Sequence, residues 1–429
     1  MFRRTLFCIF VCNLNGKRTS DKRRPSAYKQ QGLSTCPCVI VHLSTEKGIT
    51  KNINIMRLTI SSTALAGRLS ALSKVFNSKN SMPILDCYLF EVTGGTLTIT
   101  ASDSENVMTT QLQLDEADGD GTFAVNNRTI LDAVKELPEQ PLTLDVDMSS
   151  YAIKVVYMNG IYNFTGQSGN EFPRLQPLQD GAASIVIDSK TLANDISRSV
   201  FATANEELRP VMNGIYFDLT TDALAIVASD GHKLVRTRNK NIKTEAPMSF
   251  IMPKKPATLL RNVLQKNDED VLIRFDERNA TISYPGGTLS CRLIEGRYPN
   301  YNSVIPQDNP NRMTIDRAVL TGVIRRVLPF ASDSSQQVRL HIETGKAVIS
   351  SEDIDFYTSA KEEIVCDYNG TPMDIGFKGT SLMEILNNLD CEEVELQLAD
   401  PSRPCLILPT QQPENEDILM LIMPMLLND

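Results

Sequence analysis

A threefold internal repeat constrains this chain more than any other feature, because a unit that recurs three times in register must fold three times. Three segments begin alike: an alternating apolar stretch, then Ser or Asp, then apolar residues at helical spacing. The segments are residues 56–76, 184–203 and 311–332. We predict a strand and then a helix in each, with N-caps at Ser61, Asp188 and Asp316. These caps lie 127 and 128 residues apart.

The later part of the unit recurs as well. The tripeptide Ala-Ser-Asp stands at residues 101–103 and 228–230, and a looser copy lies within 347–356. A strand followed by a second helix is then predicted in each unit, and alternating strands follow that helix. These second helices fall within residues 122–138, 249–265 and 374–389. The two halves of a unit resemble each other, which indicates six half-units per chain.

Units of about 125 residues are too long to stack as a solenoid and are expected to fold as separate domains. Pro-containing joints at residues 172–181 and 298–310 lie where the units meet. We therefore predict an α+β protein of three similar domains, each with two helices packed on antiparallel sheets. The domains are predicted to cover residues 56–177, 178–306 and 307–429.

The first 55 residues differ from the rest in charge. They hold ten Lys and Arg against Asp21 and Glu46, a net charge of +8, and open with a short apolar stretch that imitates a signal peptide. No convincing cleavage site follows, so export is not the favoured interpretation. We expect Met56 to be the natural start, and residues 1–55 to be a basic extension that is disordered or artefactual.

Cysteine and hydropathy patterns indicate a cytoplasmic protein. The nine cysteines form no regular array and are interpreted as reduced thiols. A zinc site is not expected, because Cys36 and Cys38 form the only close pair and no second pair or histidine follows at ligand spacing. No apolar run approaches the roughly 18 residues of a spanning helix, so no membrane association is predicted.

Basic residues are concentrated in the predicted helices. The helices are expected over residues 63–76, 127–137, 189–201, 254–266, 316–330 and 378–389. They hold fourteen basic and five acidic side chains, although the whole chain has a net charge of −9 and the part from residue 56 onward therefore −17. A charged helix is often only a solvated face, but segregation over six helices favours a surface that meets phosphates.

Duplex DNA is therefore the predicted partner, bound through its backbone without sequence readout. The sequence contains no Trp, no zinc finger and no recognition helix with adjacent base-reading side chains. A repeat scaffold that binds proteins but not DNA is the alternative of the same architecture.

An enzyme is the main alternative class. Ser229, Asp230 and His232 are triad residue types, but side chains so close in sequence do not easily adopt the geometry of nucleophile, base and orienting group. A Gly-x-Ser-x-Gly elbow, a P-loop and a Gly-x-Gly-x-x-Gly loop are all missing from the sequence. We predict no catalytic residue, no cofactor and no metal, and interpret His232 as part of a turn or a pocket wall.

Six further motifs carry a resemblance to a known family. They lie at residues 82–90, 208–218, 227–235, 293–306, 373–377 and 421–426. With the triple repeat, they make residues 56–427 similar to the β subunits of bacterial DNA polymerase III, the sliding clamps. The resemblance implies three clamp domains per chain and a head-to-tail homodimer that closes a six-domain ring. Helices would line the hole around duplex DNA, and the protein would perform no chemistry.

The resemblance also implies three sets of functional residues. A pocket between the second and third domains would bind short linear peptides of the polymerase III α subunit, the clamp loader and repair proteins. Its residues would be Met212, Ser229, Gly231, His232, Lys233, Leu234, Pro299, Ser303, Val304, Leu421, Ile422, Met423, Pro424 and Met425. The basic positions facing DNA would be Lys79, Arg128, Arg209, Lys254 and Lys255. The dimer interface would pair Tyr162 and Phe164, on the last strand of the first domain, with Pro329 and Phe330 on the first helix of the third.

Some family positions are altered in this chain. Leu426 and Leu427 follow the Met-Pro-Met motif where the family has Arg-Leu, and Ser303 stands at a basic position. Pro210 and Val211 stand where two aromatic residues are common. The sequence therefore leaves open which partner motif is preferred.

Overall fold

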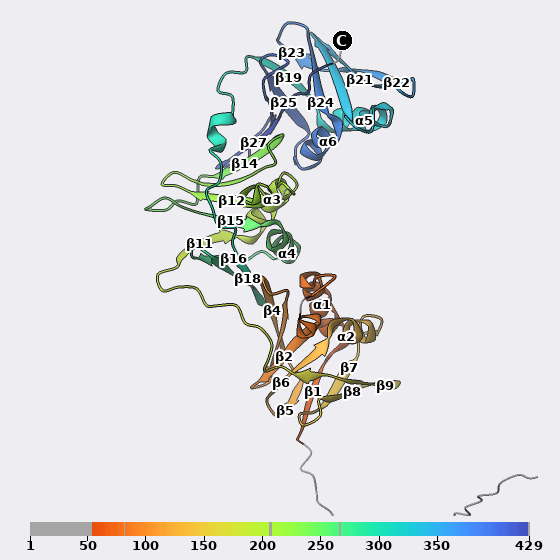
Figure 1. Ribbon diagram of the computed structural model, residues 1–429, viewed down its shortest axis with the longest axis vertical. Helices are drawn as coiled ribbons and strands as arrows, with labels where there is room; N and C mark the ends of the chain where they lie inside the picture. Colours follow the sequence, from red (N-terminus) through yellow and green to blue (C-terminus); the bar gives the residue numbers. More distant parts are fainter. Residues whose placement is uncertain (1–53, 81, 206–207, 266, 428–429) are drawn as a thin grey trace, which may run out of the picture. The chain divides into compact units, whose positions relative to one another are not determined.

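The computed structural model describes residues 54–427 except residues 81, 206–207 and 266 (Figure 1). The predicted extension lies outside these residues apart from its last two positions. The described chain repeats one order of elements three times: strand, helix, several strands, helix, several strands. The predicted α+β class and threefold repeat are confirmed.

The bounds of the elements follow the repeat. The first unit contains β1 (Ile55–Ser61), α1 (Ser62–Leu72), η1 (Ser73–Val75), η2 (Pro83–Asp86), β2 (Cys87–Thr93), β3 (Thr96–Ser102), β4 (Asn106–Gln113), β5 (Glu116–Asp118), β6 (Gly121–Asn126), α2 (Asn127–Val134), β7 (Pro141–Asp147), β8 (Ala152–Tyr157), β9 (Gly160–Thr165) and β10 (Gln167–Ser168). The second contains β11 (Ala183–Asp188), α3 (Ser189–Val200), η3 (Pro210–Met212), β12 (Gly214–Leu219), β13 (Leu224–Ser229), β14 (Lys233–Asn239), β15 (Met248–Pro253), α4 (Lys254–Leu264), β16 (Asp270–Phe275), β17 (Asn279–Tyr284), β18 (Gly287–Arg292) and η4 (Tyr301–Val304). The third contains β19 (Asn311–Asp316), α5 (Arg317–Val327), η5 (Leu328–Phe330), β20 (Gln337–Glu343), β21 (Lys346–Asp353), β22 (Thr358–Val365), β23 (Asp367–Tyr368), β24 (Met373–Lys378), α6 (Gly379–Asn387), β25 (Glu393–Leu398), β26 (Cys405–Pro409) and β27 (Glu416–Ile422). Elements marked η are short 3₁₀ helices.

The first helix of every unit begins where the sequence predicts. Ser61 Oγ accepts the backbone N–H of Ala64 at 3.1 Å. The Asp188 carboxylate accepts Thr191 N–H, and the Asp316 carboxylate accepts Val319 N–H, both at 2.8 Å. Each side chain thereby satisfies one of the backbone donors that the first turn of a helix leaves unpaired.

Removing one of these caps should destabilise its domain. We expect Asp188→Ala to lower the free energy of unfolding by about 1 kcal/mol, because Thr191 N–H loses its acceptor. Urea denaturation followed by circular dichroism measures the change. Asp222→Ala, at an exposed turn of the same domain, is the control and should shift the transition by less than about 0.5 kcal/mol. Equal shifts for the two variants would contradict the capping role.

Two of the predicted first helices are shorter than expected. The prediction ran to residues 76 and 330, but α1 ends at Leu72 and α5 at Val327, and a 3₁₀ helix follows each. Pro329 explains the second case, since proline lacks the N–H that an α-helix needs at that position. The predicted interface residues Pro329 and Phe330 therefore lie in η5 and not in α5. Tyr162 and Phe164 lie in β9. This is not the last strand of the first unit, because the short strand β10 follows it.

Antiparallel strand pairing joins consecutive units. Strand β4 of the first unit pairs with β18 of the second, and β14 of the second pairs with β27 of the third. Each junction builds a nine-stranded sheet, with orders β10-β6-β2-β3-β4-β18-β17-β16-β11 and β15-β12-β13-β14-β27-β26-β25-β19-β23. The remaining sheets have orders β5-β1-β7-β8-β9 and β22-β21-β20-β24. Strands β9 and β22 are therefore sheet edges.

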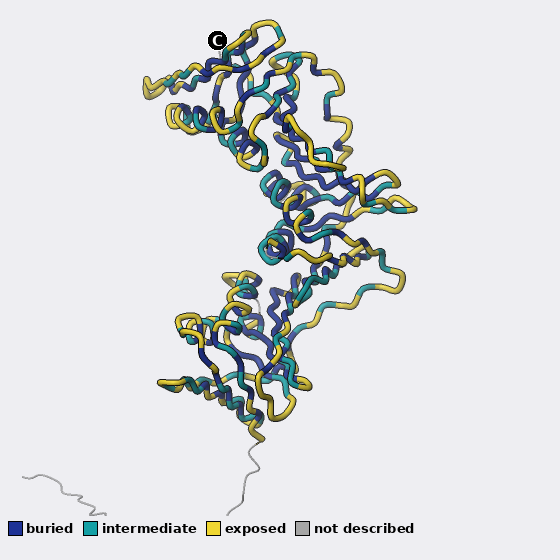
Figure 2. Tube along the Cα trace, turned by 180° about the vertical axis from the view of Figure 1, so that it is seen from behind, coloured by how far each residue is buried: buried dark blue, intermediate teal, exposed yellow. Residues whose placement is uncertain are grey.

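The two helices of each unit pack against each other beside their sheets, while the strands around the junctions are largely buried (Figures 1 and 2). The six helices contain ten basic and three acidic residues. The predicted segregation of positive charge therefore holds within the observed helix bounds.

Candidate functional site

The C-terminal segment crosses from the second unit to the third. Strand β27 pairs with β14 in a register that places Lys233 opposite Ile422. Beyond this strand, Met423 N–H donates to the carbonyl of His232, and Met425 N–H donates to the carbonyl of Gly376. Both hydrogen bonds measure 2.8 Å. The tail is therefore held by its backbone to both units, and its side chains are available for other contacts.

A cavity of about 690 Å³ lies at this crossing. Its lining residues are Asp230, His232, Lys233, Ser334, Ser335, Gln337, Lys378, Ser381, Ile422, Met423, Pro424, Met425 and Leu426. Met423 is 37% exposed and Leu426 is 85% exposed. Apolar side chains that stay open to solvent beside a polar wall are typical of a surface that binds another molecule.

A tight turn shapes the second-domain wall of the cavity. One oxygen of Asp230 accepts the N–H groups of His232 and Lys233, at 2.8 and 2.9 Å. Ser229 Oγ donates to the carbonyl of Lys233 and accepts Gly231 N–H. Gly231 has a φ of +88°, a conformation that glycine adopts without strain. His232 follows in this turn, and its N–H is committed to the Asp230 carboxylate.

The charges in this wall neutralise one another. Lys233 Nζ lies 2.7 Å from Asp230 Oδ2 and 3.2 Å from Glu384 Oε2. Burial acts to raise the pKa of Asp230, but the hydrogen bonds from Lys233 outweigh it and hold the pKa below its ordinary value. Burial likewise acts to lower the pKa of Lys233, yet Asp230 and Glu384 raise it. The arrangement is a fixed ion pair, which provides neither an activated nucleophile nor a free base.

The structure brings six of the fourteen predicted pocket residues to the cavity lining: His232, Lys233, Ile422, Met423, Pro424 and Met425. Leu234 and Leu421 instead lie in a buried cluster with Tyr298 and Tyr301. Met212 and Ser229 are also largely buried. None of these four is among the lining residues of the cavity: Ser229, Leu234 and Leu421 lie in paired strands, and Met212 lies in η3.

The remaining predicted pocket residues lie next to the lining or on the joint. Gly231 belongs to the turn beside His232. Pro299 and Ser303 are exposed, and Val304 is 50% exposed, on the segment that connects the two domains. None of these four is among the lining residues of the cavity.

Sequence reasoning missed the third-domain wall. Ser334, Ser335, Gln337, Lys378 and Ser381 line the cavity, and Gln337 Nε2 donates to the carbonyl of Leu426 at 2.8 Å. The motif at residues 373–377 was the available signal, because the tail binds the backbone of Gly376 within it.

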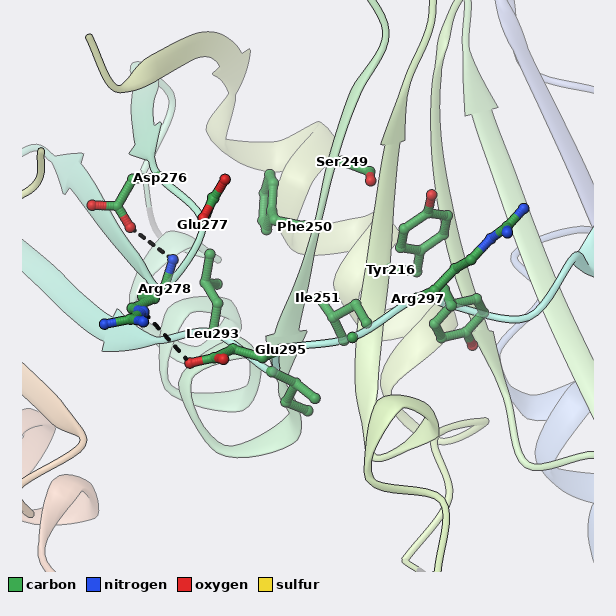
Figure 3. A pocket seen from close by; sticks show the side chains of 13 residues that line it. Tyr216, Ser249, Phe250, Ile251, Asp276, Glu277, Arg278, Leu293, Glu295 and Arg297 are labelled. Atoms are coloured by element: carbon green, nitrogen blue, oxygen red, sulfur yellow. Dashed lines mark hydrogen bonds and ion pairs between the residues drawn. The ribbon is translucent and has the colours of Figure 1, made fainter. Parts of the chain in front are cut away.

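A second cavity, of about 370 Å³, lies on the second domain (Figure 3). Tyr216 stacks on Tyr298 with ring centroids 4.7 Å apart. Arg278 lies 3.8 Å from Glu295, so opposite charges in its wall pair with each other. This cavity contains none of the predicted pocket residues.

The predicted DNA-facing residues divide into two groups. Lys79, Arg128 and Arg209 are exposed, and Lys254 Nζ donates to Asn205 at 3.3 Å on the surface. Lys255 is different, because its ammonium group lies 2.5 Å from Asp103 Oδ2 at the junction of the first two domains. Its ammonium group is therefore already paired with a carboxylate within the chain.

Three family models match most of the described chain. Residues 56–176, 186–300 and 302–426 match the N-terminal, central and C-terminal domains of the DNA polymerase III beta subunit. The chain belongs to the DNA polymerase III β-subunit family. The predicted resemblance is confirmed, and the chain has the role of a sliding clamp in DNA replication, a non-catalytic processivity factor.

Individual relatives are distant but similar over their full length. The beta sliding clamp of Haemophilus influenzae is 26% identical over 372 residues, which are 86% of this chain and all of that protein. The DNA polymerase III beta subunit of Thermotoga maritima superposes with a TM-score of 0.79 at 27% identity. The Bartonella birtlesii sliding clamp bound to griselimycin has a TM-score of 0.80 at 26% identity. In both comparisons, 87% of this chain aligns with 100% of the solved chain.

Three further observations concern the described residues. No described helix is long and apolar enough to cross a membrane. The five cysteines among residues 54–427 are all free thiols. Within the same range, no group of three or more His, Cys, Asp or Glu side chains is arranged to hold a metal ion.

Proposed function

We propose that two copies of this chain close head to tail into a six-domain ring around duplex DNA. The supporting observation is the pattern of sheet edges. Within the chain, β4 pairs with β18 at the first junction and β14 pairs with β27 at the second. Strands β4 and β14 occupy one position of the repeat, and β18 and β27 occupy another. In the third unit β22 occupies the position of β4 and β14, and in the first unit β9 occupies the position of β18 and β27. Both β22 and β9 are sheet edges. Pairing of β22 with β9 of a second copy repeats the junction and leaves no open edge of this kind.

Tyr162, Phe164, Pro329 and Phe330 lie at these two ends of the chain. Tyr162 and Phe164 are half-buried in β9, whereas Phe330 is 40% exposed in η5. Covering Phe330 in the dimer removes apolar surface from water, which favours association.

DNA would be held by encirclement and by contacts to its backbone. The basic helices supply positive potential, and Lys79, Arg209 and Lys254 are the proposed phosphate contacts. Such contacts are independent of sequence and weaken with salt. The net negative charge of the remaining surface opposes tight binding to free DNA.

The cavity at the C-terminal tail would bind short linear peptides of the polymerase III α subunit, the clamp loader and repair proteins. Methionine side chains adapt to varied partners, and the tail presents Met423 and Met425 between two domains. Griselimycin, which the Bartonella birtlesii clamp binds, is a suitable probe of this cavity. The cytoplasm is the proposed location, in keeping with the free thiols and the replication role.

Retention on closed DNA tests the ring directly. We expect the protein, once loaded with its clamp loader on nicked circular DNA, to remain bound through gel filtration in 0.5 M salt. It should leave within minutes after the circle is cut, because only topology holds it. Co-elution of labelled protein and DNA measures retention. Equal loss from circular and linear DNA would contradict encirclement and favour a protein-binding scaffold.

A further inference from the structure

The same acidic residue ends one strand of a hairpin in all three domains. Asp103 follows β3, Asp230 follows β13, and Asp353 is the last residue of β21. In each case one carboxylate oxygen accepts the backbone N–H groups two and three residues further on, at 2.7–3.1, 2.8–2.9 and 2.9–3.2 Å. The three acids are therefore equivalent members of the repeat, although the looser third copy hides this in the sequence.

In the first two domains, the second carboxylate oxygen binds a lysine, which comes from the next domain at Asp103 and from the same hairpin at Asp230. Asp103 Oδ2 lies 2.5 Å from Lys255 Nζ, and Asp230 Oδ2 lies 2.7 Å from Lys233 Nζ. Lys255 is the second residue of α4 in the next domain. Its ammonium group also donates to the carbonyl of Val75 and to Asn77 Oδ1 of the first domain, at 2.5 and 2.6 Å. The first of the three acids thus lies where the first domain meets the second.

The third acid has no such partner inside the chain. Among the described residues, no hydrogen bond or ion pair reaches Asp353 Oδ2, although Asp353 is 9% exposed. The loop 354–357 contains no Lys or Arg. Asp353 Oδ2 is therefore accessible from outside the chain, where a cation of another molecule can reach it.

The surroundings of Asp353 are also uncovered. Ile354, Phe356 and Tyr357 are 71%, 76% and 94% exposed at the tip of the β21–β22 hairpin (Figure 2). Phe330 is 40% exposed, whereas Val75 and Ala202, at the same position of the repeat, are completely buried at the internal junctions. Exposed apolar side chains thus follow Asp353 in the hairpin tip, and a further one lies in η5 of the same domain.

The repeat also identifies the missing cation. Strands β6 and β15 end at Asn126 and Pro253, and α2 and α4 begin at the following residues. Arg128 is therefore the first-domain equivalent of Lys255, and it is exposed. Within the described part of the chain, Arg128 makes no hydrogen bond or ion pair.

We propose that Arg128 of one copy forms an ion pair with Asp353 of a second copy at each of the two dimer interfaces. In the repeat, the carbonyl of Phe330 is equivalent to the carbonyl of Val75, and the hydroxyl of Ser332 is equivalent to the side chain of Asn77. At the internal junction, the Val75 and Asn77 groups bind Lys255. The guanidinium has enough donors to reach all three groups. This inference rests on the proposed dimer, and it makes Arg128 an interface residue and not a DNA contact.

A double-mutant cycle in the full chain tests the pair. Asp353→Asn retains an acceptor for the hairpin turn and Arg128→Gln retains most of the side-chain length, so both variants should fold. We expect each single variant to raise the dimer dissociation constant about 10- to 100-fold in sedimentation equilibrium. The dissociation constant of the double variant should exceed that of either single variant by no more than about threefold, because both substitutions remove the same interaction.

The possible outcomes distinguish a failure of the proposed ion pair from a failure of the proposed ring. Asp222→Asn and Arg297→Gln, both exposed on the second domain, are the controls and should leave the dissociation constant unchanged. Single variants that match these controls, or effects that multiply in the double variant, would overturn the ion pair and leave the ring intact. A wild-type chain that stays monomeric at tens of micromolar would overturn the ring and the pair together.

Discussion

Replacing Met423 with Asp should weaken griselimycin binding at least about 100-fold while the chain remains folded. Met423 lines the cavity and is 37% exposed, so its thioether offers apolar surface that a ligand covers. A carboxylate there must lose water when the ligand arrives, and Lys233 is already paired with Asp230 and Glu384. Isothermal titration calorimetry measures the dissociation constant.

The backbone at Met423 should be unaffected, because its N–H donates to the His232 carbonyl whatever the side chain. Met82→Asp is the matched control: Met82 is 41% exposed in the first domain, outside the cavity lining. Its variant should bind griselimycin like the wild type. Tight binding by the Met423 variant would show that the ligand occupies another site, and the second-domain cavity beside Tyr216 would be the next candidate.

The sequence predicted the architecture because the repeat constrains local structure three times over. Ser61, Asp188 and Asp316 each mark a helix start through a short-range rule, and the structure confirms all three. Helix ends were less certain: Pro329 stopped α5 early, a local effect that the apolar spacing concealed.

The sequence predicted only part of the cavity lining, because the walls of the cavity come from segments that are distant in the chain. Residues near His232 and Met423 belong to motifs of the family, whereas Ser335 and Lys378 acquire their role only when the tail crosses to β24. Strand register was equally hidden. It places Leu234 opposite Leu421 and buries both, so that neighbours of lining residues become core.

Asp195 is the position where pH should affect stability most. Its side chain is 1% exposed in α3, and one carboxylate oxygen has no hydrogen-bond partner among the described residues. Burial, together with the negative charge of Glu416, raises the pKa of Asp195 to about 8, although Arg198 acts in the opposite direction. Arg198 lies 3.2 Å from Glu416 and 3.5 Å from Asp195, so one cation serves two acids.

The direction of the effect follows from proton binding. Between about pH 4 and pH 8 the folded chain keeps a proton on Asp195 that the unfolded chain releases. The contribution of Asp195 to stability is therefore most favourable below about pH 4 and is progressively lost as the pH rises to about 8. Asp195→Asn mimics the protonated acid and should remove this dependence.

We expect Asp195→Asn to raise the free energy of unfolding at both pH 5 and pH 9, and the gain at pH 9 should exceed the gain at pH 5 by at least about 2 kcal/mol. Urea denaturation at the two pH values measures both differences. Asp222→Asn, at an exposed turn, should be neutral at each pH. Because Glu416 lies on β27, the strand that joins the second and third domains, the variant should also stabilise that junction in alkaline solution. A loss of stability at pH 9 would show that ionised Asp195 is held by Arg198, and that burial does not dominate its protonation.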